Sequence, residues 1–254
     1  MMNFTLSNQV QIPAVGIGTF MMTPDQAEQA VVDALACGYR MIDTAQAYMN
    51  ERAVGRGIKR SGVAREDIFI STKIWASQYL TEGTVEKSLE LLGTDYIDLM
   101  FIHQPAGDFM AGYRKLETVA IRPMVNQIEM HPYFAQESAL KVMEEYQIVP
   151  EAWAPLGGGR HNPFDNEMVK EIAAAHGKTV GQVVLRWNVQ RGVVVIPKSV
   201  HKARIEENFQ IWDFTLTEEE MQKISSLDLG YQGTAVKHFD PEFVKMCNTR
   251  KIHE

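Results

Sequence analysis

The sequence predicts an α/β fold, a (β/α)8 (TIM) barrel that opens with a β-hairpin and forms a single domain over residues 1–254. Strand-like and helix-like segments alternate along almost the whole chain, which is typical of a parallel sheet with crossover helices. No G-x-G-x-x-G motif follows a strand, because Gly16-Ile17-Gly18 lacks the third glycine and leads into no helix. An open dinucleotide-binding sheet therefore lacks its usual signal, and the barrel is favoured.

The expected elements follow one another in a regular order. A hairpin pairs Phe4–Leu6 with Val10–Ile12. Capping residues predict the helix starts, and three of them stand three residues before Gln or Glu, as in a capping box. The predicted strands are Val15–Gly18, Arg40–Asp43, Ile68–Lys73, Tyr96–His103, Pro123–Glu129, Val149–Ala154 and Val193–Pro197; the helices start at Thr23, Asn50, Thr81, Met110, Gln136, Asp165, Thr179, Ala203 and Thr217.

Composition excludes several classes of protein. The 254 residues are 45% hydrophobic, which is enough to bury a large core, and the net charge of -7 comes without a basic stripe, so we expect no nucleic-acid partner. No apolar run is long enough to span a membrane, and the first residues do not read as a signal peptide. Cys37 and Cys247 are expected to be free thiols of a cytoplasmic protein.

Polar residues that are unusual in a barrel strand recur where the predicted strands end. In a (β/α)8 barrel these positions all surround the C-terminal mouth, where barrel enzymes carry their sites. Each one alone has an ordinary structural explanation as a helix cap or a solvated side chain, whereas their coincidence at one rim indicates a site. They are Asp43, Lys73, His103, Asn126, Gln127, Trp153, Lys198 and Ser199.

Three of these residues suggest acid–base chemistry together with Tyr48. A free tyrosine has a pKa of about 10, which makes it a poor proton donor at neutral pH. A lysine ammonium nearby stabilises the phenolate and lowers that pKa, so Lys73, held by Asp43, would make Tyr48 a general acid. His103 could orient a carbonyl oxygen. Taken singly, Tyr48 could be a surface tyrosine and His103 a core histidine.

Six motifs follow one another along the chain: Gly38–Ala45, Ala47–Glu51, Lys73–Trp75, Asp98–His103, Val125–Glu129 and Ile196–Val200. They resemble motifs of the aldo-keto reductase family, and their order along the chain is that of the family. The resemblance covers nearly the whole chain and looks closest to the bacterial branch that includes 2,5-diketo-D-gluconate reductases. It implies an NADPH-dependent enzyme that reduces aldehydes and ketones to alcohols.

The resemblance also implies a role for each matching position. Tyr48 would be the acid–base residue, Asp43 and Lys73 its tuners, and His103 the residue that orients the substrate. Phe20, Trp75 and Gln104 would wall the substrate pocket, and Gln104 stands where many relatives have tryptophan, which makes the pocket more polar. The cofactor would be held by Asn126, Gln127, Trp153, Leu156, Gly157, Lys198, Ser199, Arg204 and Asn208.

The residues themselves support the phosphate end of that cofactor site. Lys198 and Arg204 flank a predicted strand-to-helix junction, and Ser199 adds a hydroxyl there. Two cations beside a helix N-terminus form a phosphate site, and here the phosphate would be the adenosine 2′-phosphate of NADPH. A solvated basic helix start is the alternative explanation.

One departure from the family concerns the fifth strand. Between Glu117 and Thr118 the sequence lacks the stretch that would complete a helix, form this strand and supply a Ser-Asn pair for the nicotinamide carboxamide. Either the printed sequence omits residues or the deletion is real and one cofactor wall is missing. Because strand number, tilt and shear are linked in a barrel, we expect an omission. Glu117 and Thr118 would then lie farther apart than the about 3.8 Å that one peptide bond allows.

Two other functions compete with a carbonyl reductase. The first is a catalytically impaired nucleotide-binding barrel that acts as a sensor or partner subunit, which the missing stretch favours and the complete set of Asp43, Tyr48, Lys73 and His103 disfavours. The second is a metal-dependent hydrolase using His103 and His131, which has no H-E-x-x-H motif behind it. We expect no metal, a small carbonyl compound as substrate, no membrane partner, and a monomer or weak dimer.

Overall fold

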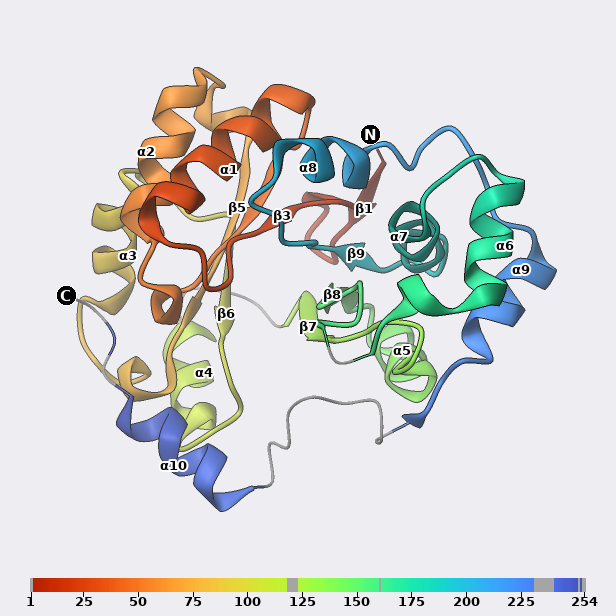
Figure 1. Cartoon of the computed structure of the whole chain (residues 1–254). Helices are drawn as coiled ribbons and strands as arrows, with labels where there is room; N and C mark the ends of the chain where they lie inside the picture. Colours follow the sequence, from red (N-terminus) through yellow and green to blue (C-terminus); the bar gives the residue numbers. More distant parts are fainter. Residues whose placement is uncertain (1, 118–122, 160, 231–239, 251, 253–254) are drawn as a thin grey trace. The chain divides into compact units, whose positions relative to one another are not determined.

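A computed structural model describes residues 2–117, 123–159, 161–230, 240–250 and 252. Contacts within the chain divide it into two compact units (Figure 1). Unit 1 comprises Met1–Gly16, Pro123–Lys198 and Ala203–Ala235, and unit 2 comprises Ile17–Arg122, Ser199–Lys202 and Val236–Glu254. Among the described residues, no helix is both long and apolar enough to cross a bilayer.

Unit 2 is built on a four-stranded parallel sheet. Its strands lie in sequence order: β3 (Ile17–Gly18), β4 (Met41–Asp43), β5 (Phe69–Ile74) and β6 (Leu99–Ile102). Asp43 is opposite Ser71 in the register. Because side chains alternate along a strand, Ser71 and Lys73 point to the same face, and Lys73 reaches the Asp43 side of the sheet.

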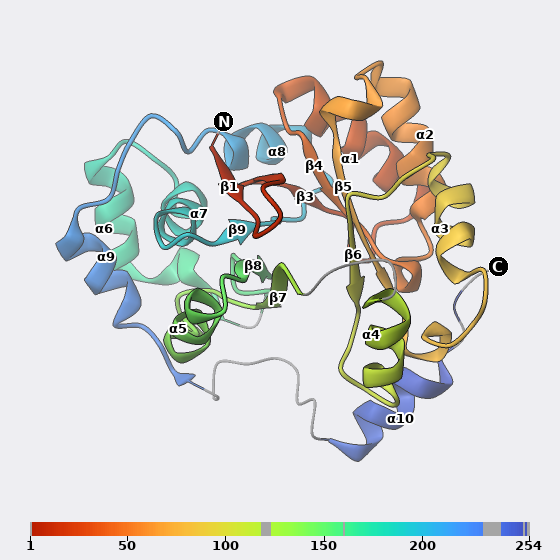
Figure 2. The same ribbon diagram turned by 180° about the vertical axis from the view of Figure 1, so that it is seen from behind.

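Helices α1, α2 and α3 of unit 2 cover one face of this sheet in both views (Figures 1 and 2). A β-carbon at Gly55 in α2 would lie 2.2 Å from the Leu92 carbonyl oxygen, so glycine is what lets α2 approach α3 this closely. The helices are α1 (Pro24–Cys37), α2 (Glu51–Ser61), α3 (Thr84–Leu92), α4 (Phe109–Glu117) and α10 (Pro241–Thr249), with short 3-10 turns η1 (Gln46–Tyr48), η2 (Arg65–Asp67) and η3 (Ala76–Gln78).

Unit 1 contains two sheets. The predicted hairpin is confirmed as β1 (Asn3–Thr5) paired antiparallel with β2 (Gln11–Pro13), and a parallel sheet runs β7 (Val125–Glu129), β8 (Val149–Trp153) and β9 (Val194–Val195). Its helices are α5 (Glu137–Glu145), α6 (Glu167–Ala175), α7 (Val180–Gln190), α8 (Lys202–Phe209) and α9 (Glu218–Ser225), with the 3-10 turn η4 (Pro163–Asp165).

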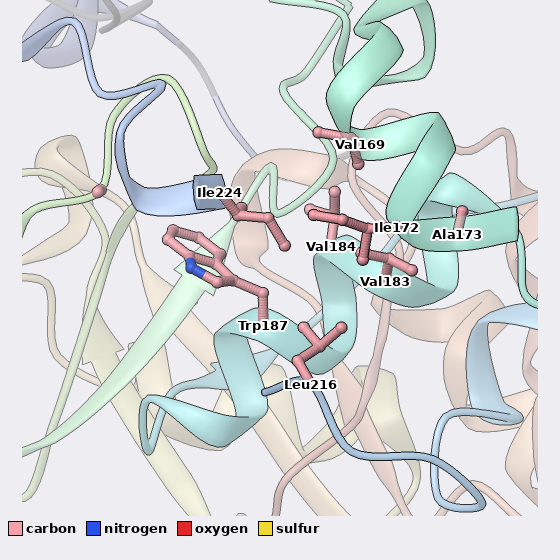
Figure 3. Close-up of a cluster of buried hydrophobic side chains, with 9 residues drawn as sticks. Val169, Ile172, Ala173, Val183, Val184, Trp187, Leu216 and Ile224 are labelled. Atoms are coloured by element: carbon pink, nitrogen blue, oxygen red, sulfur yellow. The ribbon is translucent and has the colours of Figure 1, made fainter. Parts of the chain in front are cut away.

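A hydrophobic core cluster of unit 1 lies among helices α6, α7 and α9 (Figure 3). Trp187 is completely buried there, and its indole Nε1 donates a hydrogen bond to Ser225 Oγ at 3.1 Å, so its one polar atom is satisfied. The cluster comprises Ala135, Val169, Ile172, Ala173, Val183, Val184, Trp187, Leu216 and Ile224.

Capping predictions had mixed outcomes. The capping boxes at Thr23, Thr179 and Thr217 are confirmed. The predicted cap Thr81 is wrong, because α3 begins after Gly83, which lies in the left-handed region and makes no side-chain cap. Asn50 does stand at the N-cap of α2, but its side chain does not cap the helix.

The two parallel sheets each end at the place where the fifth strand was predicted. Among the described residues, β6 is an edge strand of its sheet in unit 2, and β7 is an edge strand of its sheet in unit 1. The predicted break between Glu117 and Thr118 falls on 118–122, outside the described residues. The omission of a strand there therefore stays a prediction.

Candidate active site

Tyr48, Lys73 and Asp43 come together in unit 2. The Lys73 ammonium donates to Asp43 Oδ2 at 2.5 Å and to the Thr44 carbonyl at 2.8 Å, and both charged side chains are buried. Lys73 Nζ lies 5.0 Å from the centroid of the Tyr48 ring. Ser71 Oγ donates to the other oxygen of Asp43 at 2.8 Å. The arrangement brings the buried Lys73–Asp43 pair next to the Tyr48 ring.

His103 lies next to Tyr48. Its ring centroid is 5.5 Å from that of Tyr48, and its backbone N–H donates to the Ile74 carbonyl at 3.0 Å, which anchors it at the end of β6. Burial, followed by the positive charges of Lys73 and Arg250, holds the pKa of His103 well below its usual value. The imidazole is therefore neutral at neutral pH and can donate a hydrogen bond from one ring nitrogen.

Aromatic side chains surround these polar groups. Phe20, which is 58% exposed, meets the Tyr48 ring edge-on at 5.2 Å, and buried Trp75 meets His103 at 4.9 Å. Gln104 is half-buried, and its backbone carbonyl accepts a hydrogen bond from the Tyr79 hydroxyl. Arg250 approaches from the end of α10: its guanidinium lies 5.6 Å from the Trp75 ring centroid and donates to the Ala47 carbonyl at 3.2 Å. Of the predicted substrate residues, Phe20 therefore lies against Tyr48 and Trp75 against His103, whereas the contacts given for Gln104 are with Tyr79.

The predicted nicotinamide residues lie in unit 1. Gln127 on β7 is half-buried, and its amide Nε2 donates to Glu151 Oε1 at 2.6 Å. Glu151, on β8 and fully buried, thereby fixes the orientation of the Gln127 amide. Trp153 ends β8 with its side chain half-buried, and Asn126 is exposed.

The loop after β8 requires glycine at position 157. Gly157 has φ +88°, and a β-carbon there would lie 1.9 Å from the His161 carbonyl oxygen. The turn closes with the Gly157 N–H donating to the Ala154 carbonyl at 2.9 Å. Leu156, which precedes it, packs against the core cluster of unit 1. Only glycine fits this backbone.

The predicted phosphate residues flank helix α8. Lys198 follows β9, Arg204 lies in the first turn of α8, and both are exposed. Among the described residues, neither forms an ion pair with a carboxylate. Asn208, near the end of α8, is buried. Ser199 Oγ is already engaged, because it accepts a hydrogen bond from the His201 N–H at 3.1 Å.

Three further polar residues, two in unit 2 and one in unit 1, lie beside predicted site residues of their own unit but were not predicted to have a function. Asn50 accepts from Thr44 Oγ1 at 3.0 Å and donates to the Thr19 carbonyl at 2.9 Å, which ties the segment that leads to Phe20 to the one that carries Tyr48. The other two are Gln46, whose Oε1 accepts from the Trp75 N–H, and Glu151, which accepts from the Gln127 amide. A buried Gln or Asn next to a catalytic motif is a usable signal, but only the fold shows its partners.

The metal-site alternative finds no support in the described residues, among which no three His, Cys, Asp or Glu side chains are grouped to hold an ion. His131 is fully buried, and its Nε2 lies 3.5 Å from Glu129 Oε1. It belongs to unit 1, whereas His103 belongs to unit 2.

Comparison with known proteins agrees with this geometry. The model of the Aldo/keto reductase family matches the chain in two segments, residues 14–119 and 110–229. The chain belongs to the aldo/keto reductase family. Like that family, it is an NADP-dependent oxidoreductase that acts on aldehydes and ketones, and its fold is the predicted (β/α)8 barrel.

Individual relatives align over most of this aldo-keto reductase. It is 42% identical to the 9,11-endoperoxide prostaglandin H2 reductase of Trypanosoma cruzi, over 88% of this chain and 90% of the relative. It is 41% identical to the glyoxal reductase of Bacillus subtilis, over 88% and 91%. A solved aldo-keto reductase of Bombyx mori in complex with NADP is similar with a TM-score of 0.86, at 29% identity, over 96% of each chain.

These alignments also bear on the missing strand. The two matched segments of the family model meet at residues 110–119, where the fifth strand is expected. The alignment with the Trypanosoma cruzi relative has 257 positions, but 88% of 254 residues is only about 224, so about 33 positions have no counterpart in this chain. The relative is therefore longer within the aligned region.

Proposed function

We propose that Tyr48 donates the proton in carbonyl reduction, and the observation that carries this is the buried Asp43–Lys73 pair beside its ring. When the carbonyl oxygen takes the proton from Tyr48 Oη, a phenolate remains. Lys73 stabilises that phenolate, and Asp43 keeps the ammonium in place. Such preorganised charge accelerates the step because nothing has to reorient when charge develops.

His103 orients the substrate in this proposal. Its low pKa keeps the ring neutral, so an N–H of the imidazole donates to the carbonyl oxygen without competing as an acid. Phe20, Trp75 and Gln104 form the wall around that oxygen. With a glutamine among them, the pocket suits small polar aldehydes and ketones, a class that includes glyoxal, the compound in the name of the Bacillus subtilis relative.

The residues proposed for the cofactor suit NADPH. Gln127, oriented by Glu151, would hold the carboxamide, Trp153 would stack on the nicotinamide ring, and Asn126 would belong to the same cofactor site. Leu156 and Gly157 would lie along the pyrophosphate. Lys198, Ser199, Arg204 and Asn208 would receive the 2′-phosphate end, for which the two cations are left without a carboxylate partner among the described residues. Once bound, NADPH supplies the hydride.

The remaining proposals concern the whole molecule. We place the chain in the cytoplasm as a single domain that is a monomer or weak dimer and binds no nucleic acid. The thiols of Cys37 and Cys247, which form no disulfide, and the acidic net charge of -7 support this.

The decisive experiment follows the oxidation of NADPH by absorbance with a panel of aldehydes and ketones, while fluorescence titration measures NADPH binding. Turnover with several small carbonyl compounds supports the proposal. The two-segment family match favours one alternative, a barrel that binds the nucleotide without catalysis. Tight NADPH binding with no turnover on any compound would establish that alternative instead.

A further inference from the structure

Gln46 is a buried amide in the short turn that carries Tyr48. It lies two residues before the tyrosine, in the same 3-10 turn, and only 1% of it is exposed. A single 3-10 turn has poor intrinsic stability, so its position depends on what it is attached to. The residue before it is extended and provides no side-chain cap. The attachments of Gln46 therefore matter for where Tyr48 stands.

The carbonyl end of Gln46 is attached to the residue that directly follows strand β5. Its Oε1 accepts a hydrogen bond from the Trp75 backbone N–H at 3.1 Å. Trp75 is two residues beyond Lys73 on the same segment of chain. The bond thus joins a position two residues before Tyr48 to one two residues after Lys73.

The amide end of Gln46 is attached to helix α3. Its Nε2 donates to Thr84 Oγ1 at 3.0 Å, to the Thr84 carbonyl at 3.2 Å and to Ser88 Oγ at 3.2 Å. Thr84 and Ser88 are themselves buried. Ser88 also donates to Glu51 Oε2 at 3.4 Å, so the network extends into helix α2. Side chains held at both ends in this way have little freedom to move.

We propose that Gln46 is a positioning residue that fixes the distance between the Tyr48 phenol and the Lys73 ammonium, and thereby sets how readily Tyr48 gives up its proton. This inference rests on the proton-donor role proposed above. The side-chain hydrogen bonds of Gln46 go to Trp75, Thr84 and Ser88, so in this proposal it acts on Tyr48 through the backbone of the turn.

The distance matters because the Lys73 charge acts on the phenol through an inverse-distance interaction. Lys73 Nζ is 5.0 Å from the ring centroid of Tyr48. With an effective dielectric constant of about 20, a retreat of the turn by about 1.5 Å weakens this interaction enough to raise the pKa of Tyr48 by about half a unit. The proton becomes harder to donate, and the phenolate needed for alcohol oxidation forms only at higher pH.

The test uses Gln46→Met, which keeps the length of the side chain and removes all its hydrogen bonds. Tyr48 is titrated by NMR on protein labelled at the tyrosine ζ-carbon, and its signal is assigned with Tyr48→Phe. The expected result is a Tyr48 titration midpoint about half a unit higher than in the parent, and a rising limb of alcohol oxidation displaced equally toward high pH. A midpoint within about a tenth of a unit of the parent overturns the proposal.

A matched control separates positioning from general loss of packing. Gln190 is half-buried, and both ends of its side-chain amide bind the backbone of one distant residue. Its Nε2 donates to the Leu216 carbonyl at 3.0 Å, and its Oε1 accepts from the Leu216 N–H at 2.8 Å. Gln190→Met should lower stability without moving the Tyr48 midpoint. An equal shift in both variants would also overturn the proposal.

Two further arms keep the test decisive. If Gln46→Met does not fold, the double variant Thr84→Val, Ser88→Ala is used, which removes only the side-chain acceptors on α3. The Tyr48 midpoint should then rise by a few tenths of a unit, and a midpoint within about a tenth of a unit of the parent again overturns the proposal. If the parent shows no turnover, the proposed function fails, but the NMR titration of Tyr48 needs no substrate and still decides on Gln46.

Discussion

The charged residues proposed for proton transfer and those proposed for the cofactor phosphate are held in opposite ways. In unit 2, Lys73 and Asp43 are buried against each other and have further hydrogen bonds to Thr44 and Ser71. In unit 1, Lys198 and Arg204 are exposed and have no carboxylate partner among the described residues. Groups that must be in place when a proton moves are fixed in advance, whereas groups that recognise an anion are left open for it.

The largest expected effect concerns the stretch that is missing after Glu117, where the two segments of the family match meet. We expect the natural protein to contain the fifth strand and to have a mass above the 28.7 kDa of the printed sequence. The reason is that loss of a barrel strand should cost more than the about 5–15 kcal/mol that keeps a domain folded. Intact-mass spectrometry of the protein from its natural source checks this, and a mass of 28.7 kDa would show a true seven-strand variant.

Tyr48→Phe should remove most of the turnover. General acids typically contribute about 10²–10⁴-fold, and the phenylalanine ring preserves the contacts with Phe20 and His103 while losing the proton. NADPH affinity, measured by fluorescence titration, should be unchanged. Turnover within a few-fold of the parent would show that the proton comes from elsewhere.

Lys73→Met tests whether the buried pair is as tightly held as its geometry implies. It leaves Asp43 as an uncompensated buried charge, for which a loss of about 3–5 kcal/mol in the free energy of unfolding is expected. Lys170→Met breaks an exposed pair with Glu167 and is the control, which should leave urea unfolding unaltered. Similar unfolding midpoints for both variants would mean that the Asp43 site is solvated.

The double variant Lys198→Ala, Arg204→Ala tests whether these two exposed cations recognise the 2′-phosphate of NADPH. Charge-assisted hydrogen bonds are worth about 1.5–3 kcal/mol each, so the double variant should bind NADPH at least about tenfold more weakly and bind NADH as the parent does. Lys170→Ala serves as the charge-matched control. A parent that binds both cofactors equally well would show that these cations do not recognise the 2′-phosphate.

The smallest effect concerns the pH dependence of stability. The pKa of His103 is lower in the folded protein than the usual 6.5, so the unfolded chain binds the proton more readily. The contribution of neutral His103 to the free energy of unfolding is therefore fully present above pH 6.5. It decreases as the pH falls from 6.5 toward the pKa of His103 in the folded protein. His103→Gln should lessen this acid-side loss, which unfolding curves at a series of pH values would reveal. Identical slopes in parent and variant would argue for a solvated imidazole.

The sequence was most informative where a residue type and its spacing are tied to backbone geometry. The capping box at Thr23 and the strand-end positions of Asp43 and Lys73 are of this kind, because each depends on its immediate neighbours in the chain. Those positions led to a site whose polar residues the structure does bring together.

Other features depend on partners distant in the chain, and the sequence could not predict them. Asn50 has the type and place of a helix cap, but its Oδ1, the atom that would cap α2, accepts a hydrogen bond from Thr44 Oγ1 instead, and its Nδ2 donates to the carbonyls of Thr19 and Met22. Gly55 resembles an unfavourable helix residue until the Leu92 carbonyl is seen beside it. Glu151 resembles a surface carboxylate on a strand, and only the register of β7 and β8 pairs it with Gln127.

The contact of Arg250 with the segment that carries Tyr48 allows substrate selectivity to evolve separately from the chemistry. Its guanidinium contacts the Ala47 carbonyl and the Trp75 ring from the end of α10, which follows the last described strand of the chain. Peripheral segments of this kind accept sequence change more readily than the strands they cover. Substitutions in α10 can therefore reshape the surroundings of Trp75 and His103, and so the range of carbonyl compounds accepted, while Asp43, Lys73 and the chemistry they support remain untouched.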